Sequence, residues 1–130
     1  MDIRSRKSDH VDSARGKKVE YALSSGFDEV RLVHGSLPEM DLGDVDACCT
    51  LFGKKLSSPL IISGMTGGYP EAHKINLKLA AAAEKEGLAL GLGSQRAMIE
   101  KPELAATYKV RKAAPSIPLI GNIGGCQLKK

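Results

Sequence analysis

Three glycine-rich segments of the 130-residue sequence carry the side chains best suited to binding a ligand. They are residues 63–68, 91–96 and 121–126. Glycine lets the backbone approach a ligand closely, and each segment adds a hydroxyl, amide or guanidinium group that can form hydrogen bonds. None has the spacing of the Walker P-loop or of the dinucleotide fingerprint. The residues alone therefore predict a polar or anionic planar ligand, against the simpler interpretation of three tight turns.

Basic side chains in two places could bind phosphate. Arg96 could hold a phosphate by bidentate hydrogen bonds, although a surface ion pair is the competing interpretation. Arg6, Lys7 and His10 form a second cluster, for which a solvated tail is the alternative. The net charge is +4, and with two Phe, three Tyr and no Trp the chain offers few platforms for stacking bases. We expect a phosphorylated small molecule and not nucleic acid.

Other classes of site and location are disfavoured. The cysteines Cys48, Cys49 and Cys126 are odd in number and two are adjacent, which predicts neither a disulfide framework nor a metal site. We interpret them as small buried residues in a reducing compartment. The sequence has no run of eighteen apolar residues and its start lacks the apolar core of a signal peptide. We expect a cytoplasmic protein that does not enter a membrane.

The elements that would position the glycine-rich segments alternate between strand and helix. Short apolar runs at 60–62, 88–90 and 119–120 each end at one of these segments. Strands of this kind, separated by helices at intervals of about thirty residues, are typical of parallel α/β folds. Loops that follow the strands of such folds lie on one side, where ligands bind.

Two helices would link these runs. The first begins near Pro70 and ends at Gly87, because proline suits a first helical turn and glycine a helix end. The second follows Pro102 and ends near Arg111 and Lys112. The side chains expected to face inward are Ala72, Ile75, Leu79, Ala82 and Ala83 in the first helix and Leu104, Ala105 and Tyr108 in the second.

The amino-terminal part of the chain has a weaker pattern. Ser8, Asp9 and His10 could cap a helix that runs to about Leu23. A β-hairpin is expected from Val45 through Leu56, and it would close one end of the main domain. Between them, Phe27, Val30, Leu32 and Val33 would anchor a connecting segment.

The same residues resemble a known family, the type 2 isopentenyl-diphosphate isomerases. The family's amino-terminal basic motif is similar to Arg6–His10, and its next segment looks like Phe27–His34 followed by Leu37–Glu39. Its flavin and substrate loops are matched, in order, by Met65–Gly68, Gly93–Arg96 and Asn122–Gly124. The resemblance covers essentially the whole chain, but only about the first third of a family member.

The resemblance implies an α/β fold, a TIM (β/α)₈ barrel that binds FMN and needs Mg²⁺. Residues 1–58 would be an amino-terminal extension with a closing tail and the hairpin, and residues 59–130 the first three barrel strands with two intervening helices. Such enzymes interconvert isopentenyl and dimethylallyl diphosphate. FMN, reduced by NADPH, would itself exchange the protons, adding one at C4 and removing one from C2, so no side chain is named as catalytic.

The resemblance also implies roles for individual residues. The flavin would be contacted by Met65, Thr66, Gly67, Ser94 and Asn122. The substrate would be bound by Ser94, Gln95 and Arg96, with Arg96 on the diphosphate, and by a closing tail carrying Arg6, Lys7 and His10. The Mg²⁺-binding acid would come from later strands, which this chain does not contain.

Several alternatives stay open. The chain could be a catalytically inactive fragment, or one half of a split enzyme completed by another chain. It could instead belong to another FMN-dependent barrel oxidoreductase, such as a 2-hydroxyacid oxidase. The basic tail and the loop Ser94–Arg96 favour a diphosphate over a hydroxy acid. Family members tend to be homo-oligomers, so a second copy or a complementing chain is the expected partner.

Overall fold

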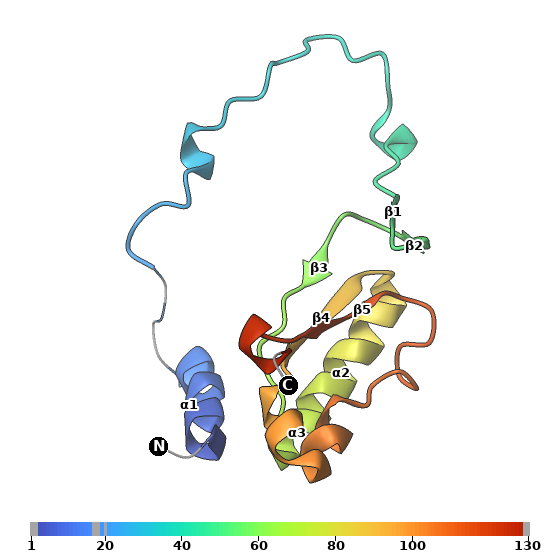
Figure 1. Cartoon of the computed structure of the whole chain (residues 1–130). Coiled ribbons are helices and arrows are strands. Elements are labelled where there is room, and N and C mark those ends of the chain that lie inside the picture. The colour runs from blue at the N-terminus through green and yellow to red at the C-terminus, as the bar shows by residue number, and fades with distance from the viewer. Residues whose placement is uncertain (1–2, 17–18, 20, 129–130) are drawn as a thin grey trace.

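The computed structural model describes residues 3–16, 19 and 21–128. Within these residues, a three-stranded sheet is formed by β3 (Ile61–Ile62), β4 (Ala89–Ser94) and β5 (Leu119–Asn122), with β4 in the centre. Both pairings are parallel. The carboxyl ends of the strands therefore lie at one edge (Figure 1). The α/β class and the three predicted parallel strands are confirmed.

Helix α2 (Pro70–Glu86) connects β3 to β4 as the sequence predicts. It begins at Pro70 and ends at Gly87, whose left-handed backbone (φ 64°) caps the carbonyls of the last turn. Its buried stripe is Ala72, Asn76, Ala80 and Ala83. Ile75 and Leu79 are half-buried, and Ala82 is exposed because it lies about 100° around the helix from Ala83. The prediction for Ala82 was therefore wrong.

The second connection differs from the single helix that the sequence predicts. Helix α3 (Arg96–Glu100) comes first, and a 3₁₀ helix (Pro102–Tyr108) follows it. They are separated because Pro102 disfavours a helical backbone at Lys101, whose φ and ψ are −137° and 92°. Leu104 and Tyr108 are buried and Ala105 half-buried, as predicted. Arg111 lies beyond this helix and donates to the carbonyls of residues 114 and 117.

The hydrophobic core lies on one face of the sheet. Leu90 and Leu92 of β4, two residues apart, point toward Ala80 and Ala83 of α2. The rest of this core cluster comprises Tyr108, Val110, Ala114 and Ile117. The other face, described below, carries no helix within the described residues, and Ile61 on it is 51% exposed.

The hairpin forms, but it is shorter than the sequence predicts. Strands β1 (Cys49–Leu51) and β2 (Lys54–Leu56) pair antiparallel. Phe52 and Gly53 both have positive φ, the geometry of a two-residue type I′ turn. Asp46 accepts a hydrogen bond from the Cys48 amide at 2.8 Å, which replaces the strand pairing expected there.

The hairpin lies at the amino ends of the sheet strands. The Ser57 amide donates to the Gly87 carbonyl at 2.9 Å, and the Lys54 ammonium donates to the Ser116 carbonyl. Gly87 lies two residues before β4, and Ser116 lies three residues before β5. The hairpin is therefore at the end of the sheet opposite the glycine-rich loops. This supports the expected closure of one end by the hairpin, whereas the division at residues 58 and 59 stays a prediction.

The amino-terminal segment departs most from the sequence predictions. Helix α1 (Ile3–Gly16) begins before Ser8 and ends at Gly16, not near Leu23, because glycine is a poor helix former. The expected anchor residues Phe27, Val30, Leu32 and Val33 are all exposed. In Figure 1, residues 21–48 form an extended segment away from the sheet, so these side chains do not pack against the described core.

The predicted burial of the cysteines was also mostly wrong. Cys48 and Cys126 are exposed, and Cys49 is half-buried in β1. Cys48 precedes the shortened hairpin, and Cys126 lies in the loop after β5, so neither is on the core face of a strand.

Replacing Gly87 by alanine tests the link between α2 and the hairpin. An added Cβ would lie 2.2 Å from the Ser57 hydroxyl oxygen, and φ is 64°. We expect the free energy of unfolding to fall by about 1–2 kcal/mol, because a side chain is strained in the left-handed region. The measurement is urea denaturation followed by circular dichroism. Gly43→Ala is the control, because no atom lies within 4 Å of its Cβ position; equal midpoints for both variants would contradict the argument.

Glu84 should make stability depend on pH. Its carboxylate accepts hydrogen bonds from the Ser116 hydroxyl and from the amides of Ser116 and Ile117, which lower the pKa of Glu84 below 4.5. A lowered folded-state pKa stabilises the fold above the unfolded-state pKa, and this contribution is lost as pH falls through the folded-state value. The Tm difference between the parent chain and Glu84→Gln should be largest near pH 7 and vanish below the lowered pKa.

The control for this experiment is Glu86→Gln. Glu86 is also in the last turn of α2, but within the described residues its ion pair is with the neighbouring Lys85, at 3.7 Å on the surface. Its replacement should leave Tm nearly unchanged at every pH. A constant Tm difference for Glu84→Gln between pH 7 and pH 3 would show that the carboxylate does not bind the segment before β5.

Candidate functional site

The three glycine-rich loops meet at the carboxyl edge of the sheet. The Gly93 amide donates to the Thr66 carbonyl at 3.1 Å, which joins the loop after β3 to the end of β4. The Gln95 amide donates to the Asn122 carbonyl at 2.8 Å, which joins the loop after β4 to the end of β5. The structure thus brings together the loops that the sequence singles out, through main-chain hydrogen bonds.

An open hollow of about 410 Å³ lies on the face of the sheet that α2 does not cover. Its lining includes Ser63, Gly64, Gly91, Gly121, Asn122 and Ile123. A Cβ on Gly64 would lie 2.3 Å from the Leu92 carbonyl oxygen, so only glycine lets the two strands approach at this level. The rest of the lining is apolar and comprises Ile61, Leu92 and Ile120. Three glycines beside apolar side chains suit a flat ring with polar edges better than a bulky ligand.

The residues of the first loop that the sequence predicts to bind a cofactor differ in their exposure and in their contacts. The Met65 side chain is 62% exposed beside the hollow. Thr66 is buried, and its hydroxyl lies 3.4 Å from the Tyr69 hydroxyl. Gly67 is also buried, and a Cβ there would lie 2.1 Å from the ring of Tyr108. Met65 can contact a ligand through its side chain, whereas the buried Thr66 and Gly67 fix the position of the loop.

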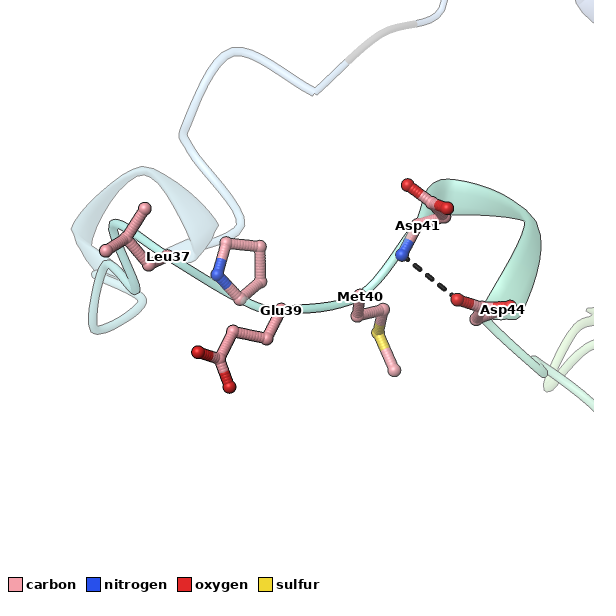
Figure 2. Close-up of a pocket in the computed structure, with 6 residues that line it drawn as sticks. Leu37, Glu39, Met40, Asp41 and Asp44 are labelled. Carbon is pink, nitrogen blue, oxygen red and sulfur yellow. Dashed lines mark hydrogen bonds between the residues drawn. The ribbon is translucent and has the colours of Figure 1, made fainter.

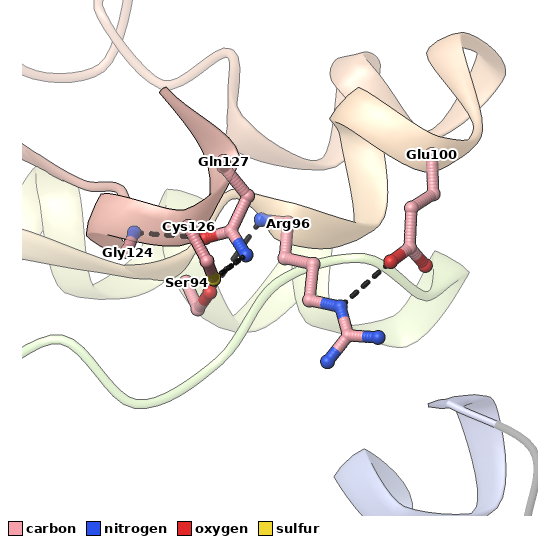
Figure 3. Close-up of polar contacts among 6 residues, drawn as sticks. All are labelled: Ser94, Arg96, Glu100, Gly124, Cys126 and Gln127. Carbon is pink, nitrogen blue, oxygen red and sulfur yellow. Dashed lines mark hydrogen bonds and ion pairs between the residues drawn. The ribbon is translucent and has the colours of Figure 1, made fainter. Parts of the chain in front are cut away.

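In the second loop, the predicted residues Ser94 and Gln95 are both half-buried. Ser94 is half-buried, and its hydroxyl lies 3.5 Å from the Arg96 amide (Figure 3). The Gln95 side chain lies near Gly121, where a Cβ would come within 3.1 Å of its amide nitrogen. Asn122 is exposed at the end of β5. Of the three residues, Asn122 lines the hollow, and Ser94 and Gln95 lie next to it through the pairing of β4 with β5.

Arg96 forms the ion pair that the sequence leaves open as an alternative. Its Nε lies 2.6 Å from Glu100 Oε1, one turn later on α3, and this hydrogen bond raises the pKa of Arg96. The side chain is 53% exposed. In Figure 3 the contact with Glu100 is drawn from Nε, and neither terminal guanidinium nitrogen is joined to Glu100. The ion pair therefore orients the fork and leaves its outer edge available to an anion.

The loop after β5 adds polar groups next to Arg96. Gln127 Oε1 accepts a hydrogen bond from the Gly124 amide at 2.9 Å, and Gln127 Nε2 lies 2.8 Å from the Cys126 sulfur (Figure 3). Sequence reasoning did not single out Gln127, because one glutamine after a glycine-rich segment carries no distinctive signal.

The amino-terminal basic cluster is not brought to these loops. His10 is exposed on α1, which Figure 1 shows apart from the sheet. Arg6 and Lys7 also lie in α1, and the prediction for their side chains concerns atoms outside those that the structure describes. The described part of the connection between α1 and the hairpin, residues 21–48, is exposed at every position, so it does not hold α1 against the sheet.

A second concave region lies far from this edge, in the bend at residues 37–44. It encloses about 470 Å³, and Figure 2 shows Leu37, Glu39, Met40, Asp41 and Asp44 around it. Every lining residue is exposed, and the Asp41 amide donates to the Asp44 carboxylate at 3.1 Å. Although it is larger than the hollow, this region is a bend in an exposed segment with no buried wall, and we do not treat it as a site.

Sequence reasoning also missed the polar role of buried Asn76, and it predicted Tyr108 only as an inward-facing side chain. Asn76 of α2 donates to the carbonyls of Thr66 and Thr107, and Tyr108 donates to the carbonyl of Ser94. An asparagine between the apolar positions of an amphipathic helix is the one signal that could have indicated this role.

Two further features concern metal binding and membrane insertion. Within residues 3–16, 19 and 21–128, no three His, Cys, Asp or Glu side chains gather in a way that could hold a metal ion. Among the same residues, none of the helices is both long and apolar enough to span a bilayer.

Comparisons with known proteins identify the relatives of this chain. No family model matches it. Curated proteins named isopentenyl-diphosphate delta-isomerase do match: those of Rickettsia bellii (strain RML369-C) and Rickettsia akari are 48% and 44% identical over 128 residues, which is 98% of this chain and 37% of each relative. The protein of that name from Methanothrix thermoacetophila is 47% identical over 131 residues, covering the whole chain and 36% of the relative.

The chain thus spans little more than a third of the length of the curated relatives that it matches. Identity of 44–48% over nearly every residue shows that it is homologous to the amino-terminal portion of the isopentenyl-diphosphate delta-isomerases.

Proposed function

We propose that this chain supplies the ligand-binding loops of a type 2, FMN-dependent isopentenyl-diphosphate delta-isomerase. The reaction interconverts isopentenyl and dimethylallyl diphosphate in isoprenoid biosynthesis. The observation that carries the proposal is the meeting of three glycine-rich loops, through main-chain hydrogen bonds, beside a hollow lined by three glycines and by apolar side chains. The names of the homologues support the reaction.

The residues around the hollow fit FMN. Glycine at positions 64, 91 and 121 leaves a flat surface for a ring system, while the exposed Met65 and Asn122 can contact its face and edge. When bound and reduced, with NADPH as the electron donor, the flavin supplies the acid/base chemistry of the proton shift. Ser94, at the end of β4, would lie between flavin and substrate.

The diphosphate would lie at the rim of the site. The outer edge of the Arg96 guanidinium suits bidentate binding of phosphate oxygens, and Gln95 would add hydrogen bonds. Arg6, Lys7 and His10 would close over the diphosphate when substrate binds. Mg²⁺ would accompany the diphosphate, with protein ligands from outside the part of the chain that the structure describes, because that part offers no cluster of ligands.

The fold supports a (β/α)₈ barrel completed by further chain. Strands β3 and β5 each pair on one side only within the described residues. Unpaired edges of this kind promote pairing with other strands. Completion by sequence like that of the longer relatives, by a complementing chain, or within a homo-oligomer would satisfy both edges.

A chimeric protein tests the proposal directly. Residues 1–130 of this chain would replace the matched segment of the Rickettsia bellii relative. The purified chimera should retain FMN at about one per chain and, with NADPH and Mg²⁺, convert isopentenyl to dimethylallyl diphosphate. A chimera that folds but neither retains FMN nor catalyses the isomerisation would refute the proposal, provided that the unaltered relative does both.

Arg96→Ala in the same chimera tests the diphosphate contact. Loss of charge-assisted hydrogen bonds should raise KM for isopentenyl diphosphate about tenfold or more. Glu100→Gln is the matched control, because it removes the ion pair and leaves the guanidinium, so KM should change much less. If KM is unchanged in Arg96→Ala, the residue does not bind substrate.

A further inference from the structure

We propose that Asn76, Thr107 and Tyr108 form a buried clamp that sets the position of the loop after β3 relative to the end of β4. Through this clamp they would act as positioning residues for the flavin and substrate contacts of Met65, Thr66, Gly67 and Ser94. The catalytic part of this inference rests on the proposed function, whereas the clamp itself rests on contacts within the chain.

Asn76 joins two connecting segments. It is 3% exposed, and its Nδ2 donates to the carbonyl of Thr66 at 3.3 Å and to the carbonyl of Thr107 at 3.2 Å. One amide group therefore uses both of its protons to hold the loop after β3 against the 3₁₀ helix Pro102–Tyr108. The same Thr66 carbonyl also accepts from the Gly93 amide, so Asn76 acts where the loop contacts β4.

Thr107 makes the second connection between the same two segments. Its hydroxyl accepts a hydrogen bond from the Gly68 amide at 3.0 Å and donates to the Leu104 carbonyl at 2.7 Å. The hydroxyl proton is therefore directed at Leu104, and the oxygen lone pairs face the loop. Both ends of the segment Thr66–Gly68 are thus hydrogen-bonded to buried side chains.

Tyr108 connects the first loop to the second. Its hydroxyl donates to the Ser94 carbonyl at 2.8 Å, and its ring fills the space where Gly67 has no side chain. Burial raises the pKa of Tyr108, so the phenol stays protonated and keeps donating at neutral pH. One side chain therefore fixes the distance between Gly67 and Ser94.

The clamp lies behind the loops and outside the hollow. None of its three side chains is among those that line the hollow, and each hydrogen bond from it ends on a main-chain atom. An apolar core would stabilise the fold without directional bonds to loop carbonyls and amides. Bonds of this kind select one loop position among several that apolar packing permits.

Two pairs of variants test the clamp. Thr107→Val keeps the shape and removes the hydroxyl, whereas Thr107→Ser keeps the hydroxyl and is the rescue variant. Tyr108→Phe removes the hydroxyl that donates to the Ser94 carbonyl and keeps the ring. Val110→Ala is the control, because Val110 is buried in the same core cluster but makes no bond to the loops.

The first measurement is hydrogen exchange of the Gly68 amide in the 130-residue chain, which needs no ligand. Its protection should fall about tenfold or more in Thr107→Val and be retained in Thr107→Ser and Val110→Ala. Unchanged protection in Thr107→Val would overturn the clamp, whatever the function of the protein.

The second measurement is FMN affinity and the kinetics of the chimera. Thr107→Val and Tyr108→Phe should each raise the FMN Kd about tenfold, and Val110→Ala should leave Kd unchanged even where it lowers Tm as much. Unaltered Kd in both clamp variants, or an equal rise in Val110→Ala, would overturn the positioning role. If the parent chimera binds no FMN, the proposed function fails instead, and the Gly68 exchange alone decides the clamp.

Discussion

The parallel pairing of β4 with both β3 and β5 is the interaction on which the rest of the structure depends. Parallel neighbours require long crossover connections, and here both crossovers, α2 and the segment 95–118, return the chain to the amino ends of the strands. Every loop that leaves a strand therefore does so at the same edge. Three segments that are far apart in the sequence therefore lie at one edge, where they can form a single site.

The close approach of the loops at that edge has a structural cost that the buried side chains offset. Gly64 and Gly93 allow contact between backbones, and Gly67 makes room for the ring of Tyr108, but glycine also leaves a loop with more conformational freedom than any other residue. Hydrogen bonds from Asn76, Thr107 and Tyr108 restrict this freedom from behind. The glycines at positions 64, 91 and 121 can then line the open face together with apolar side chains and Asn122.

The amino-terminal segment and the bare face of the sheet have a common feature. Large apolar side chains are exposed along residues 19–45 and at Leu60, Ile61 and Ile123. Exposed apolar surface of this extent is typical of surfaces that contact another protein segment. Under the proposed function, these surfaces would pack against the portion of an isomerase that lies outside the 37% matched by this chain. The same contacts would then bring α1 and its basic side chains to the loops.

The local pattern of the sequence determined much of the fold. The runs before each glycine-rich segment, Pro70, Gly87 and the period of α2 predicted three parallel strands, one long helix and a shared edge of loops, because these features depend on neighbouring residues. Tertiary structure decided the rest. The burial of Asn76 and its hydrogen bonds to Thr66 and Thr107 depend on which segments meet in space. Whether Phe27 is an anchor or an exposed side chain depends likewise on a packing partner, which no pattern of nearby residues encodes.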